Sequence, residues 1–226
     1  SGIYATDNAE VAINNNTISG HSGGSSITIT QGAYAIINSN TITGSSGNTA
    51  VEISRGSSAT IVSNTIQSAD NGISVQDSSH AILINNTVSS NSYDGLYVEN
   101  NASVILAAGN TFSSNNVGIH LVLGGSLNMW CDDQLISATT ISCNTLGAIK
   151  VDGGSAVDLC NLTISSKYNG IDSWRGGNIR LKNVTITGST KYGLRTHGTI
   201  VDASDSTISG STNSEIKAEA SIIILD

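Results

Sequence analysis

Apolar residues recur along the chain at a nearly fixed spacing. A four-residue pattern, first seen as Asn16-Thr17-Ile18-Ser19, returns with its apolar member at positions 18, 42, 66, 88, 112, 141, 164, 186 and 208. Successive copies lie 22 to 24 residues apart, except for one interval of 29 residues. A near-constant period of this length is the signature of a repeat fold.

Two further apolar series run in phase with the first. One series contains Ile3, Ile27, Val51, Ile73, Leu96, Ile119, Ile149, Ile171, Leu194 and Ile216. The other lies about eight residues later, with inward pairs such as Val11/Ile13, Ala35/Ile37 and Ile105/Ala107. Short runs that alternate apolar and polar residues predict strands, and the Gly, Ser, Asn and Asp between them predict turns. Each repeat therefore predicts three strands, which form one coil of a parallel β-solenoid.

The repeats define the expected architecture. About ten coils, spaced by roughly 4.8 Å, predict a rod about 48 Å long. We expect one all-β domain over residues 1–226, with an insertion in the coil around 128–139. A loop of this kind often hangs over the binding face of a solenoid. The alternative is a surface loop whose Trp130 covers apolar surface.

The repeats also resemble a known superfamily. The Asn-Thr-Ile-Ser copies and the Gly-Ile/Leu-X-Val runs, such as Gly72-Ile73-Ser74-Val75, resemble the right-handed parallel β-helix proteins. That superfamily includes pectate lyases, polygalacturonases, alginate epimerases and phage tailspikes. The resemblance covers nearly the whole chain and implies a right-handed, three-faced helix. It describes the scaffold, so the function has to be argued from the faces. Asp132-Asp133 resembles the paired aspartates of polygalacturonases, but Arg180-Leu181-Lys182 precedes His197-Gly198, which is the wrong order for that family.

Composition narrows the classes of function. Charged residues make up 12% of the chain and the net charge is −8, which disfavours a nucleic-acid binder. No apolar run approaches membrane-spanning length, so we expect no membrane span. No cysteine and histidine spacing is typical of a metal site, so neither a metal nor a cofactor is expected. We expect an extracellular or cell-surface protein.

Three cysteines, Cys131, Cys143 and Cys160, cluster around the irregular coil. One interpretation is a disulfide between Cys131 and Cys143 that holds the insertion. The other is that the three residues are small buried apolar side chains. Five asparagines at one turn position predict a structural ladder of stacked amides. They are Asn16, Asn40, Asn64, Asn86 and Asn110.

The outward positions of the first strand carry the candidate chemistry. Neighbouring coils bring like positions together, so Lys150, Asp172 and Arg195 should align, as should Asp152, Trp174 and His197. One hypothesis is polysaccharide or glycan binding through Tyr97, Glu99, His120 and Trp174. A second adds catalysis, with Asp152 or Asp172 as base, Arg195 or Lys150 stabilising developing charge, and His197 nearby. The third is a solvated face of paired charges without further purpose.

The third strand presents a row of threonines, which resembles the Thr-X-Thr arrays of β-solenoid ice-binding proteins. Its candidate ice-binding residues are Thr17, Thr41, Thr43, Thr65, Thr87, Thr111, Thr140, Thr163, Thr185, Thr187 and Thr207. The alternative is that threonine simply suits β-strands.

The second strand is apolar on both faces in part of the chain. Its predicted outward residues are Tyr34, Ile36, Ile82, Ile84, Val104 and Leu106. An outward apolar row predicts packing against another chain, as in the shaft of a surface fibre, tailspike or adhesin. The alternative is that the register of this strand slips by one residue, which reverses its two faces.

Overall fold

The computed structural model describes residues 1–107, 109–129 and 139–225. Its strands are β1 (Ile3–Ala5), β2 (Glu10–Asn14), β3 (Thr17–Ile18), β4 (Ile27–Ile29), β5 (Tyr34–Asn38), β6 (Thr41–Thr43), β7 (Thr49–Ile53), β8 (Ser58–Val62), β9 (Thr65–Gln67), β10 (Asn71–Val75), β11 (His80–Ile84), β12 (Thr87–Ser89), β13 (Asp94–Val98), β14 (Ser103–Leu106), β15 (Thr111–Ser113), β16 (Val117–Leu121), β17 (Ser126–Met129), β18 (Thr140–Asn144), β19 (Gly147–Asp152), β20 (Ala156–Ser166), β21 (Asn169–Trp174), β22 (Asn178–Thr187), β23 (Tyr192–His197), β24 (Ile200–Asp202), β25 (Thr207–Ser209), β26 (Ser214–Glu219) and β27 (Ile222–Ile224).

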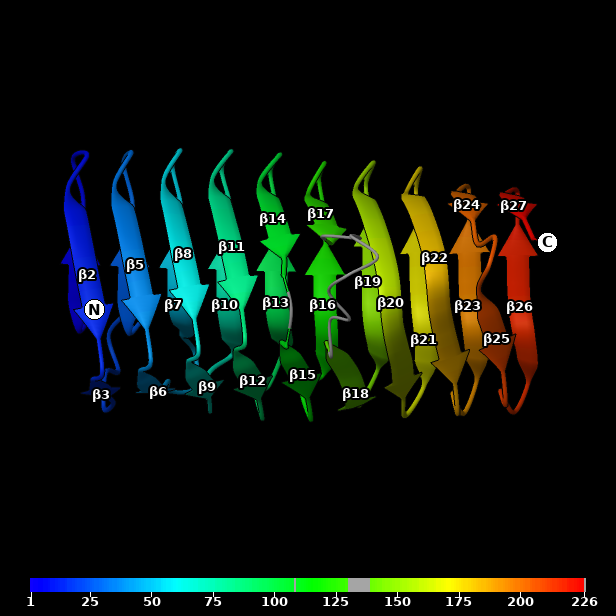
Figure 1. The fold of residues 1–226 in the computed structure, drawn as a ribbon, viewed down its shortest axis with the longest axis horizontal. Coiled ribbons are helices and arrows are strands. Elements are labelled where there is room, and N and C mark those ends of the chain that lie inside the picture. The colour runs from blue at the N-terminus through cyan, green and yellow to red at the C-terminus, as the bar shows by residue number, and fades with distance from the viewer. Residues whose placement is uncertain (108, 130–138, 226) are drawn as a thin grey trace.

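These strands wind into a solenoid whose coils follow one another along its long axis (Figure 1). The first strands of the coils form a ten-stranded parallel sheet in the order β1-β4-β7-β10-β13-β16-β19-β21-β23-β26. The second and third strands pair in the same way, for example β5 with β8 and β6 with β9. The predicted all-β parallel solenoid is confirmed.

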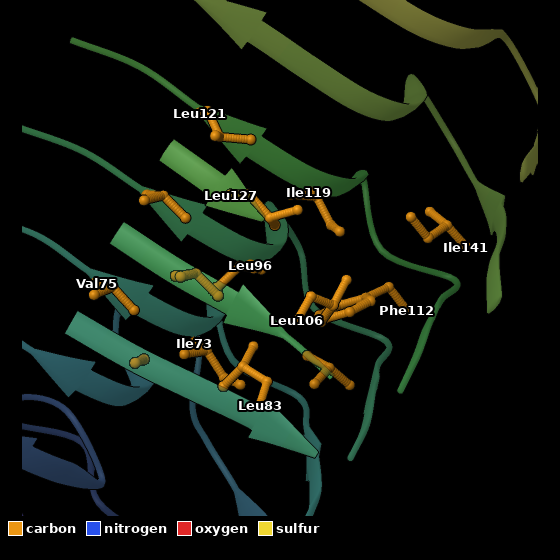
Figure 2. Close-up of a cluster of buried hydrophobic side chains, with 14 of the residues drawn as sticks. Ile73, Val75, Leu83, Leu96, Leu106, Phe112, Ile119, Leu121, Leu127 and Ile141 are labelled. Carbon is orange, nitrogen blue, oxygen red and sulfur yellow. The ribbon is translucent and has the colours of Figure 1, made fainter. Parts of the chain in front are cut away.

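The core is a column of apolar side chains that point inward from all three strands. In the first sheet, Ile73 pairs with Val51 on one side and Leu96 on the other, which continues the predicted series. Figure 2 shows this column in the middle of the rod, where Phe112 lies among Leu106 and Ile141. Phe112 is the largest fully buried side chain among the described residues. Burial of this column stabilises the stack, because no coil can bury its apolar residues alone.

The second strand departs from the prediction in one coil. Val104 and Leu106 point inward, are almost fully buried, and pair with Ala81 and Leu83, so their predicted outward positions are wrong. Ile105 faces outward instead. Residues 104–107 are all apolar, so the hydrophobic pattern does not fix the register there. The pairing of β14 with β11 fixes the register.

The predicted asparagine ladder is present, and it is buried from Asn40 to Asn110. From Asn16 to Asn110, the backbone N–H and the side-chain amide of each asparagine donate to Oδ1 of the next, over 2.8–3.1 Å. The side-chain amides of Asn40, Asn64 and Asn86 also donate to a backbone carbonyl of the preceding coil. A second ladder, which we did not predict, links Asn91, Asn115 and Asn144 over 2.9–3.3 Å. These amides satisfy turn backbone that would otherwise be buried without partners.

The turn changes in the second half of the chain. Leu162 and Val184 replace the asparagine and are buried, and β20 and β22 run through the former turn as single long strands. Asn161 and Asn183 keep the positive φ of the turn, at 52° and 53°. The apolar pair therefore replaces the amide ladder while the bend is retained.

The cysteine prediction needs a correction. Cys160 is buried on β20 and is disulfide-bonded. With three cysteines in the chain, the predicted pair of Cys131 with Cys143 is wrong, because it leaves Cys160 without a partner. Residues 130–138, which contain most of the predicted insertion, lie outside the described residues.

Replacing Asn64 tests the ladder. Asn64→Ala removes the acceptor of Asn40 and the donor to Ile37. We expect the free energy of unfolding to fall by about 2–4 kcal/mol, because each buried group without a partner costs about 1–3 kcal/mol. Urea unfolding measures this value. Asn16→Ala, at the exposed end of the ladder, is the control with a smaller expected loss, and equal losses would contradict the role of burial.

Candidate functional site

The candidate residues lie on the outward face of the ten-stranded sheet, in the predicted columns. Lys150 pairs with His120 on one side and Asp172 on the other, and Asp172 pairs with Arg195. In the second column, Trp174 lies between Asp152 and His197. The alignment predicted from the sequence is therefore present. We call the outward side of the ten-stranded sheet, which carries both columns, the first-strand face.

Asp172 is the centre of one cluster. The side chain is buried, and Arg195 holds both of its carboxylate oxygens, with Nε donating to Oδ1 over 2.8 Å and Nη2 donating to Oδ2. The indole N–H of Trp174 donates to Oδ1 over 2.7 Å, and the amide of Asn169 donates to Oδ2 over 3.2 Å. Four donors thus occupy this carboxylate, so its geometry fits an anchor and leaves no lone pair directed at a ligand.

The anchor fixes an aromatic surface. The indole of Trp174 stacks on the imidazole of His197, with ring centroids 5.2 Å apart and an interplanar angle of 24°. The guanidinium of Arg195 lies 5.0 Å from the centre of the same indole. His197 also contacts Glu219, with Nδ1 3.3 Å from Oε2. The four predicted residues Asp172, Trp174, Arg195 and His197 therefore form one unit.

His120 is the centre of a second cluster. Its Nδ1 lies 3.0 Å from Oδ2 of Asp94, and its Nε2 lies 3.9 Å from Oδ2 of Asp152, which is ion-pair distance and too long for a hydrogen bond. Burial alone lowers the pKa of the imidazole, but the carboxylates of Asp152 and Asp94 raise that pKa to about 9. His120 is therefore a cation at neutral pH, held between two carboxylates.

Tyr97 packs against this imidazole edge-on, with ring centroids 5.6 Å apart. Burial, and then the nearby carboxylate of Glu99, raise the pKa of the Tyr97 hydroxyl to about 12. The phenol therefore remains neutral across the physiological range, and its hydroxyl is engaged with the carboxylate of Glu99. Lys150 lies between the two clusters by its pairing with His120 and Asp172, and its positive charge opposes the protonation of His120.

Two members of these clusters were missed by the sequence analysis. Asp94 and Asn169 each stand just before the Gly-Leu or Gly-Ile that opens an inward run. Both are buried, yet both direct polar side chains at the first-strand face. The sequence does carry a signal for these residues, which is an Asn or Asp directly before Gly in several repeats, as in Asn71-Gly72, Asp94-Gly95 and Asn169-Gly170. The first residue of each pair belongs to a third column of the sheet.

A groove on the N-terminal half of the same face was also missed. Its cavity volume is about 500 Å³, and Tyr4, Thr28, Glu52 and Arg55 are among its lining residues. Small hydroxyl side chains, such as the buried Thr28, make it hollow. Glu52 accepts hydrogen bonds from Ser25 over 2.7 Å and from Gln76 over 3.2 Å. In these coils the first outward column carries a single charge, that of Glu52, whereas charged residues predominate farther along the chain.

The predicted threonine row is continuous. Thr17, Thr41, Thr65, Thr87, Thr111, Thr140, Thr163, Thr185 and Thr207 pair one after another across the coils. Most of these side chains are exposed, and the pairing of Thr111 with Thr140 spans the insertion without a break. In the flanking column, Thr43 and Thr187 are half-buried.

The second-strand face carries the predicted apolar residues in part. Tyr34 and Ile36 are 37% and 41% exposed, and Ile82 and Ile84 are half-buried. Self-association through this face stays a prediction.

The right-handed β-helix region family matches residues 1–130. This match spans more than half of the chain, so the protein belongs to the right-handed β-helix family. No curated protein matches the chain. Among the described residues, no group of three or more His, Cys, Asp or Glu is placed to hold a metal ion. The described part of the chain also contains no helix with the length and hydropathy needed to cross a membrane.

An NMR titration of His120 tests the second cluster. We expect its imidazole to titrate at about pH 9. Because this pKa is raised above the usual value of 6.5 for an unfolded chain, the contribution to stability is complete below about pH 6.5 and is lost as the pH rises through about 9.

Asp94→Asn should lower the pKa of His120 by about 1–3 units, because a neighbouring charge is removed. Asp77→Asn, at an exposed turn of the same sheet, is the control that leaves this pKa unchanged. Titration of His120 at its ordinary pKa in the unmodified protein would contradict the assigned ion pairs.

Proposed function

We propose that the protein is an extracellular glycan-binding β-helix that holds a polysaccharide along the first-strand face. The observation that carries this proposal is the aromatic surface of Trp174 and His197, fixed from beneath by the buried Asp172. Rings held in place beside polar groups are suited to sugars, whose C–H faces are apolar and whose edges carry hydroxyls. The disulfide at Cys160 supports an oxidising, extracellular environment.

Binding is better supported than cleavage. A general base needs a carboxylate lone pair within reach of the substrate proton. Asp172 receives four donors, and Asp152 lies against the cationic His120. Glu219 contacts both Lys217 and His197. These pairings fix the shape of the face and leave Lys150, Arg195 and the tyrosines as donors toward a ligand.

The direct test is a glycan array, with product analysis of every glycan that binds. The unmodified protein should bind at least one polysaccharide. We expect Trp174→Ala and His197→Ala to weaken that binding by at least about tenfold, which corresponds to about 1.4 kcal/mol.

Tyr34→Ala removes a comparably exposed ring from the second-strand face and is the matched control. Equal binding by all variants would contradict the proposal, and so would the absence of any bound glycan. Release of shortened products would show that the protein cleaves the glycan, and catalysis would then replace binding as the proposed function.

The threonine row favours a second candidate function, ice binding. Nine threonines in unbroken register present a regular array of hydroxyl and methyl groups at the spacing of the coils. The serines and Gln67 of the flanking column make the array less regular.

Thermal hysteresis measures this activity. If the row binds ice, Thr87→Tyr and Thr111→Tyr should each abolish the hysteresis, because a bulky ring at the centre of the array prevents close contact. The glycan-binding variant His197→Ala should retain it. Absence of hysteresis in the unmodified protein excludes this candidate.

A further inference from the structure

Cationic residues are concentrated at one end of the rod. Eight of the nine lysines and arginines stand at or after position 150, namely Lys150, Lys167, Arg175, Arg180, Lys182, Lys191, Arg195 and Lys217. The chain as a whole carries a net charge of −8. A general attraction to polyanions is therefore disfavoured, and any binding of an anion needs a local arrangement of these cations.

One such arrangement lies at the edge of the first-strand face, where the turns enter β21 and β23 and where Lys217 of β26 lies beside them. We call Tyr168, Lys191, Tyr192 and Lys217 the lysine–tyrosine patch. The ammonium of Lys191 lies 4.6 Å from the ring centre of Tyr168 and 5.5 Å from that of Tyr192, and it also donates to the Tyr168 hydroxyl. The ammonium of Lys217 lies 5.7 Å from the Tyr192 ring. Two cations and two phenols thus share one small area.

The cations of this area differ in their partners. Arg195 is bound to Asp172, and Lys217 lies 3.0 Å from Oε1 of Glu219. Among the described residues, no carboxylate lies within ion-pair distance of Lys191. Its ammonium is positioned by aromatic rings, which attract a cation without neutralising its charge. The Lys191 ammonium therefore keeps its charge and further N–H donors beside the Tyr168 hydroxyl and the Tyr192 ring.

The patch adjoins the aromatic surface of the first-strand face. Tyr192 pairs with Asn169, and the amide of Asn169 holds the carboxylate of Asp172. Trp174 pairs with His197 at the other end of the same two strands, and Arg195 lies between, so a ligand that runs along the strands from Trp174 over Arg195 reaches the patch. The groups it meets there are donors, and an anionic substituent accepts hydrogen bonds from them more strongly than a neutral hydroxyl does.

We propose that the lysine–tyrosine patch binds a carboxylate or sulfate substituent of an acidic glycan, and that it makes the first-strand face selective for such glycans over neutral ones. This inference rests on the proposed glycan binding. It adds that the ligand carries a negative charge and that Lys191 recognises this charge.

The test uses matched pairs of oligosaccharides in isothermal titration calorimetry. Hexagalacturonate and its fully methyl-esterified form differ in the carboxylate charge, and sulfated and unsulfated chondroitin hexasaccharides differ in sulfate. We expect one acidic member to bind at least about tenfold more tightly than its partner, with an affinity that falls as salt is added. Preference for the first or the second pair identifies the substituent as carboxylate or sulfate.

Lys191→Gln should remove this preference and leave binding of the neutral, methyl-esterified hexagalacturonate unchanged. Lys182→Gln makes the same change of charge at an exposed position on β22, outside the first-strand face, and should leave the preference intact. Equal losses in the two variants, or equal affinity for the two members of each pair, overturn the inference while the proposed glycan binding stands. If none of the four hexasaccharides binds and the array also finds no ligand, both proposals fall.

Discussion

The structure depends on one constraint, that each coil must fit in register on the next. No coil has an interior of its own, so its inward residues are buried only when the neighbouring coils cover them. The buried amide ladders enforce this register because each asparagine fills the bonding positions of the coil beside it. Where the amides end, the buried pair Leu162 and Val184 occupies the same position through apolar packing.

The same constraint shapes the outward faces. A residue on one coil lies roughly 4.8 Å from its equivalents, so charges in a column must pair or repel. Asp172 and Arg195 form a direct ion pair, and His120 is held between the carboxylates of Asp94 and Asp152 on the two neighbouring coils. This pairing makes the face rigid. It also occupies the carboxylate of Asp172 with four donors, so this group is suited to holding the face in place for recognition.

The sequence was most informative where the position of a residue within the repeat alone determines its place in the fold. A strict period assigns Lys150, Asp172 and Arg195 to one column from their spacing along the chain, and it places the nine threonines in one row. It does not determine which of two apolar neighbours turns inward, as at Leu106, because both choices bury similar surface. Nor does it reveal partners on neighbouring coils that are offset along the strands, such as Asp94 beside His120, since those contacts depend on side-chain direction. The sequence also does not determine the disulfide of Cys160, because the spacing of three cysteines allows several pairings.

The most direct measurement is an NMR titration of the protein with the glycan that binds most tightly in the array. The account predicts that the indole N–H signal of Trp174 and the imidazole signals of His197 shift with saturation, while the signals of the threonine row remain in place. It also predicts that these shifts disappear in Trp174→Ala. Shifts centred on the threonine row or on the second-strand face would show that the ligand lies elsewhere and would contradict the account.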